Sequence, residues 1–78
     1  MEVIEIKNSS AIAKVSFDVE QHIVGIAFTY NADKDYLYKC DTIEDVKSYI
    51  IETEETGGSV GKLINQYKKD ATFETINI

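Results

Sequence analysis

The chain has 78 residues, of which 44% are hydrophobic and 28% charged, the composition of one small globular domain over residues 1–78. Its formal net charge is −6, and all its basic residues are lysines, so it lacks the planar guanidinium group that binds phosphates and guanine edges. The apolar runs are too short to cross a membrane, and the acidic composition makes nucleic acid an unfavourable partner. A lone cysteine, Cys40, and the absence of a visible signal peptide predict a cytoplasmic protein.

The first forty residues predict an antiparallel β-meander. Short runs of alternating, β-branched or aromatic residues cover 2–7, 11–17, 23–30 and 36–40, with turn-forming polar residues between them. In the first run, the residues predicted to face inward are Val3 and Ile6. In the second run, the inward positions are predicted to be Ala11, Ala13, Val15 and Phe17.

After residue 40 the hydrophobic period becomes that of two helices. In residues 41–55 the predicted inner stripe is Ile43, Val46, Tyr49 and Ile50. Asp41 or Thr42 is the predicted N-cap of this first helix, and Gly57 and Gly58 are predicted to end it in left-handed conformations. The second helix is predicted to begin after Ser59, with the inner stripe Val60, Leu63, Ile64, Tyr67 and Ala71.

The predicted fold class is therefore α+β. We expect an antiparallel sheet of three to five strands with two helices packed on one face. The number of strands stays open, because the sequence does not decide whether residues 2–7 and 71–78 join the sheet. The contact between helices and sheet is predicted to run through Ile43, Val46, Ile50, Leu63, Ile64 and Tyr67.

The segment ETGGSVGKL at residues 55–63 looks at first like the phosphate-binding loop of a nucleotide enzyme. That loop requires glycine five positions before the second glycine and Ser or Thr after the lysine, and it follows a buried strand. Here Thr56 and Leu63 occupy those two positions, and a predicted helix precedes the segment. The segment is better explained as a connection between two helices, so we predict no bound nucleotide.

No other motif predicts catalysis or a cofactor. Asn31, Asp33 and Asp35 begin like a calcium loop, but the glycine and glutamate required later in that motif are missing. The single histidine, His22, and the single cysteine, Cys40, are too few for a zinc site built from those ligands. We expect a non-enzymatic protein without metal or cofactor, in which Cys40 is a buried or half-buried thiol.

Tyrosines give a first candidate binding surface. Tyr36 and Tyr38 stand two apart on a predicted strand and therefore share a face, and Tyr30 lies on the preceding strand. Three such rings could stack unpaired bases of RNA or single-stranded DNA. In the alternative interpretation, Tyr36 and Tyr38 line the core beneath the helices. We favour this one, because a base-stacking platform normally has basic neighbours.

Clustered carboxylates give a second candidate surface. Residues 41–55 carry six acidic side chains against one lysine, and Glu52, Glu54 and Glu55 lie at the end of the first helix. The preferred hypothesis is a protein-interaction module whose acidic helix meets a basic protein partner. An acidic DNA mimic that inhibits a nucleic-acid enzyme is a further alternative, although mimicry usually needs denser charge.

Taken in order, several short motifs resemble the KTSC domain, a small module named after the C-terminus of some lysyl-tRNA synthetases. They are SSAI at 9–12, YLY at 36–38 and SVGKLIN at 59–65, and the resemblance covers roughly residues 8–70. The chain departs from the family pattern in lacking the proline that usually follows the Y-x-Y motif. The resemblance implies a module of unknown activity, for which RNA binding has been suggested.

Overall fold

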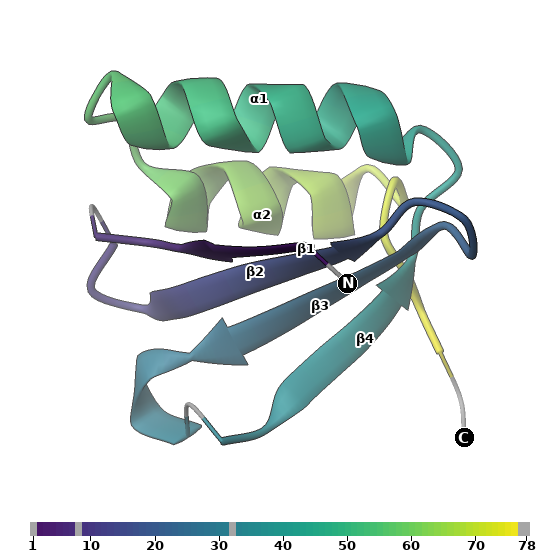
Figure 1. Cartoon of the computed structure of the whole chain (residues 1–78), viewed down its shortest axis with the longest axis horizontal. Helices are drawn as coiled ribbons and strands as arrows, with labels where there is room; N and C mark the ends of the chain where they lie inside the picture. Colours follow the sequence, from purple (N-terminus) through teal and green to yellow (C-terminus); the bar gives the residue numbers. More distant parts are fainter. Residues whose placement is uncertain (1, 8, 32, 77–78) are drawn as a thin grey trace.

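The chain forms one five-stranded antiparallel sheet with two helices on one of its faces (Figure 1). The structure is a computed structural model, and it describes residues 2–7, 9–31 and 33–76. The strands lie across the sheet in chain order, and both helices lie in sequence between the fourth and the fifth strand. The predicted α+β class is confirmed.

The elements are β1 (Glu2–Glu5), β2 (Ile12–Asp18), β3 (Ile23–Phe28), the short 3-10 helix η1 (Thr29–Asn31), β4 (Asp35–Lys39), α1 (Ile43–Glu55), α2 (Val60–Lys69) and β5 (Glu74–Thr75).

Cross-strand pairing places one set of apolar side chains beneath the helices. Val15 pairs with Ile26, and Val24 pairs with both Phe17 and Tyr38, so alternate residues of three strands face the same way. All five are buried. Burying such side chains contributes about 1.5–3 kcal/mol each relative to exposure, so this face supplies much of the stability of a small domain.

A register shift corrects the predicted face of the second strand. The pairing of β2 with β3 is irregular between Ile12 and Lys14, so the simple alternation breaks at that point. Ile12 is buried in the core, whereas Ala11, which was predicted to face inward, is exposed. The prediction was wrong at Ala11 because a strict period of two cannot anticipate an extra residue in a strand.

In the first run, Ile6 is buried as predicted, whereas the prediction for Val3 is wrong. Val3 pairs with Ser16 on the face away from the helices and is 55% exposed. Ile4 pairs with Val15 and packs against the core. Val3 and Ile4 are adjacent and therefore point to opposite faces. A strand of four residues is too short for its alternation to show which of the two faces the core.

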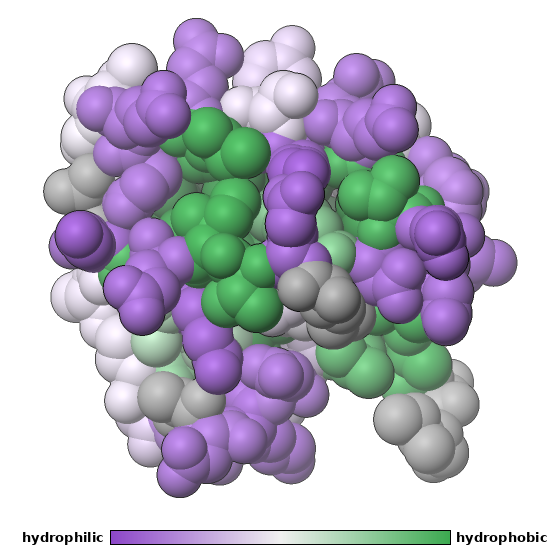
Figure 2. Space-filling view, viewed as in Figure 1, coloured by the Kyte–Doolittle hydropathy of each residue, from purple (hydrophilic) through white to green (hydrophobic). Residues whose placement is uncertain are grey.

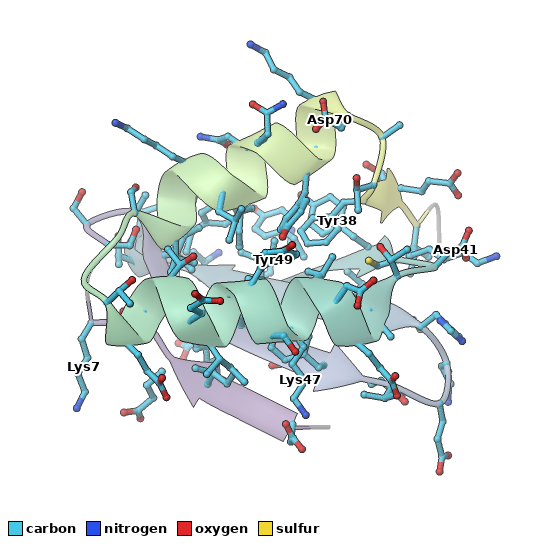
Figure 3. All side chains as sticks on the ribbon, turned by 90° about the horizontal axis from the view of Figure 1, so that it is seen from above. Lys7, Tyr38, Asp41, Lys47, Tyr49 and Asp70 are labelled. Carbon is cyan, nitrogen blue, oxygen red and sulfur yellow. The ribbon has the colours of Figure 1, made fainter. Side chains whose placement is uncertain are left out.

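Helix α1 buries Ile43, Val46 and Ile50, as the spacing predicts. Tyr49 was expected in the same stripe but is 61% exposed. Seen from above the helices, it lies between α1 and α2 at the outer surface (Figure 3). Successive residues of a helix are rotated by about 100° around its axis, so Tyr49 lies about 100° from Ile50. This position is at the margin of the buried stripe, which consists of Ile43, Val46 and Ile50.

Helix α2 buries Val60 and Ile64, with Leu63 and Tyr67 partly buried against the core. It ends at Lys69, and Ala71 adopts a left-handed φ of 59° beyond the helix. The prediction that Ala71 completes the inner stripe is therefore wrong. The apolar period extended past the end of the helix, where the chain instead turns to bring Phe73 into the core.

Both ends of the described chain join the sheet. β1 pairs with β2 along its full length, and β5 pairs with the end of β4 through Tyr38 and Lys39. The open question about residues 2–7 and 71–78 is thus settled for the residues that form β1 and β5, and positions 77–78 lie outside the described residues. Viewed from the same side as Figure 1, the surface shows apolar side chains separated by hydrophilic ones (Figure 2).

Candidate functional site

The glycine segment is a helix connection in which the N–H groups of Gly57 and Gly58 are hydrogen-bonded within the chain. The Gly58 N–H donates to the Thr53 carbonyl at 2.8 Å, and the Gly57 N–H donates to the Glu54 carbonyl at 3.3 Å. This is the Schellman pattern that ends a helix, and Gly57 supplies its left-handed residue with φ of 78°. Gly58 was also expected to be left-handed, but it is not among the residues with positive φ.

The next helix begins with the capping residue that the sequence predicts. Ser59 has an extended backbone, and its hydroxyl accepts a hydrogen bond from the Lys62 N–H at 3.2 Å. At the start of α1, Thr42 holds the N-cap position but makes no side-chain capping bond. Two acidic residues in the first turn, Glu44 and Asp45, instead complement the positive end of the helix dipole.

Cys40 lies in the core and His22 on the surface. The thiol is 0% exposed, and burial raises its pKa, an effect that a hydrogen bond from Thr42 partly opposes. His22 is exposed in a left-handed turn with φ of 57°, and its carbonyl accepts a hydrogen bond from the Cys40 N–H at 2.8 Å. The two residues are therefore linked through their backbones, and the buried thiol matches the prediction of a core cysteine.

The described surface has shallow hollows. A hollow of about 430 Å³ lies at the start of α1, lined by Val19, His22 and residues 41–45. Within residues 2–7, 9–31 and 33–76, no three His, Cys, Asp or Glu side chains are grouped so as to hold a metal ion.

The three candidate tyrosines do not form one exposed platform. Tyr38 is buried beneath the helices, where its ring stacks on Phe73 with 5.7 Å between centroids. Lys68 of α2 lies over the same ring, 5.8 Å from its centroid. Tyr36 is half-buried, and Tyr30 on η1 is 76% exposed. Tyr38 therefore packs in the core, as the alternative interpretation described, and is not available to stack a base.

Tyr30 and Tyr36 instead share an aromatic cluster with Phe28. The Phe28 ring stacks on Tyr30 at 5.5 Å and meets Tyr36 edge to face at 5.4 Å. A side-chain hydrogen bond with Tyr36 raises the pKa of the Tyr30 hydroxyl above its ordinary value. The Lys34 ammonium lies 5.0 Å from the centre of the Tyr36 ring. The sequence pattern did not indicate Phe28 and Lys34 as members of this cluster, although both flank the turn that carries Tyr30.

The three candidate glutamates divide into two kinds. The Glu54 carboxylate accepts hydrogen bonds from the Lys7 N–H at 2.9 and 3.2 Å and so joins the end of α1 to the segment after β1. Glu52 and Glu55 are exposed on the outer side of α1. They share that side with Glu44 and Asp45, whose side chains are also exposed.

The neighbouring helix carries the opposite charge. α2 contains Lys62, Lys68 and Lys69 and no acidic residue. A shallow depression of about 730 Å³ follows its outer side between Lys62 and Lys69. In the described part of the chain, the one ion pair joins Lys47 of α1 to Glu2 of β1. The outward charges of the two helices therefore have no ionic partner among the described residues.

Comparisons with protein-family models, curated proteins and solved structures found no match to this chain. The KTSC resemblance accordingly stays a prediction from the quoted motifs. Among the residues that the structure describes, no helix is long and apolar enough to cross a bilayer.

Proposed function

We infer that this chain is a non-enzymatic protein-interaction module, and that it binds a basic protein surface through the outer side of α1. The observation that carries this proposal is the exposure of Glu52 and Glu55 beside Glu44 and Asp45. Four carboxylates lie on one solvent-facing helix surface, and none of them is paired with a lysine among the described residues. Carboxylates arranged in this way attract a basic partner and orient it during association.

Tyr49 adds an apolar component to the same surface. Tyr49 is 61% exposed next to the carboxylates, and tyrosine is enriched at protein interfaces because it combines a large apolar area with a polar hydroxyl. Glu54 is not part of the proposed contact surface, because its carboxylate holds the Lys7 backbone. The proposed surface therefore consists of Glu44, Asp45, Tyr49, Glu52 and Glu55.

A retention experiment with matched variants tests this proposal. Immobilised wild-type protein and a Glu52→Gln/Glu55→Gln variant are exposed to nuclease-treated lysate of the source cell at low salt. A Glu20→Gln/Glu74→Gln variant has the same net charge but alters exposed residues outside the helices. We expect a basic protein that the wild type and the Glu20/Glu74 variant retain and the Glu52/Glu55 variant loses. Equal retention by all three proteins would refute the proposed surface.

The aromatic cluster supports a second candidate function, the binding of single-stranded nucleic acid. Exposed Tyr30 stacked on Phe28 offers a ring face, and Lys34 brings a positive charge within reach of a phosphate. This candidate predicts that oligonucleotides quench tyrosine fluorescence at low salt and that Tyr30→Ser removes the effect. The absence of quenching at low salt would eliminate it.

A further inference from the structure

The two helices divide the charge of the outer layer between them. α1 carries five acidic side chains and one lysine, whereas α2 carries three lysines and no acid. They lie side by side on the same face of the sheet and run in opposite directions, so the C-terminal end of α1 is next to the N-terminal end of α2 (Figure 1). One exposed surface thus presents an acidic stripe beside a basic stripe.

The charges on the two stripes have the same spacing. Asp45 and Glu52 on α1 are seven residues apart, as are Lys62 and Lys69 on α2. Seven residues correspond to about two helical turns, or roughly 10.5 Å along the axis. All four side chains are exposed, and none forms an ion pair within the described part of the chain. The two carboxylates of one copy could therefore lie opposite the two lysines of another copy, because both pairs have the same spacing along the helix.

We propose that two copies of this chain associate through their helix layers, with α1 of each copy on α2 of the other. A two-fold axis parallel to the helices produces this arrangement. Rotation about such an axis does not change the position of a residue along the axis direction. Glu52 then faces Lys62 of the second copy, and Asp45 faces Lys69 of the second copy. Because the interface is isologous, each of these contacts forms twice, and the paired helices run antiparallel.

Tyr49 supplies the apolar centre of this interface. It lies between the two helices, midway along the interval from Asp45 to Glu52, and it is one of the few large apolar side chains that remain exposed (Figure 3). The pKa of Tyr67 is raised mainly by burial, and the neighbouring hydroxyl of Tyr49 raises it further. Next to the two-fold axis, Tyr49 meets Tyr49 of the second copy.

This inference rests on the proposed function, since it names a second copy as a partner of the acidic surface. Sedimentation velocity from micromolar to millimolar concentration tests it on three proteins. The first is the wild type. The second is Asp45→Lys/Glu52→Lys, which places lysines at the facing positions of both stripes, and the third is Lys62→Glu/Lys69→Glu, which places carboxylates at the facing positions of both. The expected result is a reversible dimer for the wild type and a monomer for each variant alone.

Mixing the two variants tests the proposed pairing of the stripes directly. Each stripe of one variant complements the facing stripe of the other, so the mixture is expected to form a one-to-one dimer. A Glu20→Lys/Glu74→Lys protein has the same net charge as the Asp45/Glu52 variant and is expected not to dimerise with the Lys62/Lys69 variant. Circular dichroism of each variant checks that it is folded.

A wild type that stays monomeric at every concentration would overturn the proposal, as would dimers of either variant alone. A mixture that remains monomeric would overturn it as well. These outcomes are distinguishable from a failure of the proposed function, because a monomeric wild type that still retains a basic protein through Glu52 and Glu55 contradicts only the self-association.

Discussion

Single residues at the helix connection determine how the chain passes from α1 to α2. Gly57 is left-handed at φ of 78°, and a Cβ built there meets nothing within 4 Å. The cost of Gly57→Ala is therefore conformational and should be about 1 kcal/mol of unfolding free energy. Gly57→Asn should cost less, because asparagine tolerates the left-handed region. Urea denaturation measures both changes, and equal losses would contradict the conformational explanation.

Ser59 provides a hydrogen bond that can be removed without disturbing the core. Its hydroxyl accepts from the Lys62 N–H, so Ser59→Ala should cost about 1 kcal/mol by leaving an amide at the start of α2 without a partner. Ser59→Asp keeps an acceptor and should retain most of the stability. Lys62→Ala should change the urea midpoint little, because that side chain is exposed. A larger loss from Lys62→Ala than from Ser59→Ala would contradict this assignment.

Cys40 should react slowly with thiol reagents in the folded protein. Burial both hides the thiol and raises its pKa above the ordinary value of 9.0, so little thiolate forms. The unfolded chain loses this proton first as the pH rises, so the contribution of Cys40 to stability should decline above 9.0 until the folded-state pKa is passed. Labelling rates with and without urea, and urea midpoints of wild type and Cys40→Ala against pH, check these expectations. Fast labelling of the native protein would contradict them.

At the scale of elements, α2 allows a comparison between two adjacent apolar residues. Ile64 is 1% exposed, whereas Leu63 is only partly buried. Ile64→Ala should cost about 2–5 kcal/mol through lost burial and a cavity, and Leu63→Ala should cost clearly less because its site is open to relaxation and solvent. Urea denaturation ranks the two variants. The reverse order would mean that α2 faces the sheet differently.

The elements also show where sequence patterns are informative. Both helices and the core strands follow from period and capping, and Ile43, Val46 and Ile50 are buried as their spacing predicts. Val3 was misplaced because a four-residue strand carries little periodicity, and Ala11 because a register shift is a property of two strands together. Ala71 was assigned to a helix that had already ended.

The candidate site was less predictable than the fold for a similar reason. The exposure of Glu52 and Glu55 follows from the wheel of α1, whereas the bond from the Lys7 N–H to Glu54 joins residues 47 positions apart. The grouping of Tyr30 with Phe28 instead of Tyr38 depends on η1, which replaces the predicted end of the third strand. Contacts between distant segments and the ends of elements are decided by tertiary packing, which a local pattern does not encode.

At the scale of the whole molecule, the sheet and the helix layer have different exposed surfaces. β1 is an edge strand, and its Glu2 and Glu5 place negative charges on an edge that could otherwise pair with another chain. The helix layer presents acidic α1 beside basic α2. The helix layer is therefore the surface that combines regularly spaced charged side chains with the exposed ring of Tyr49.

Amide chemical-shift mapping tests whether the outer side of α1 is the binding surface. Isotope-labelled protein is titrated with the basic partner recovered in the retention experiment, and the shifted amides are placed on the structure. We expect saturable shifts concentrated at five residues of α1: Glu44, Asp45, Tyr49, Glu52 and Glu55. Shifts centred on Phe28, Tyr30 and Tyr36, or on the sheet face away from the helices, would contradict it.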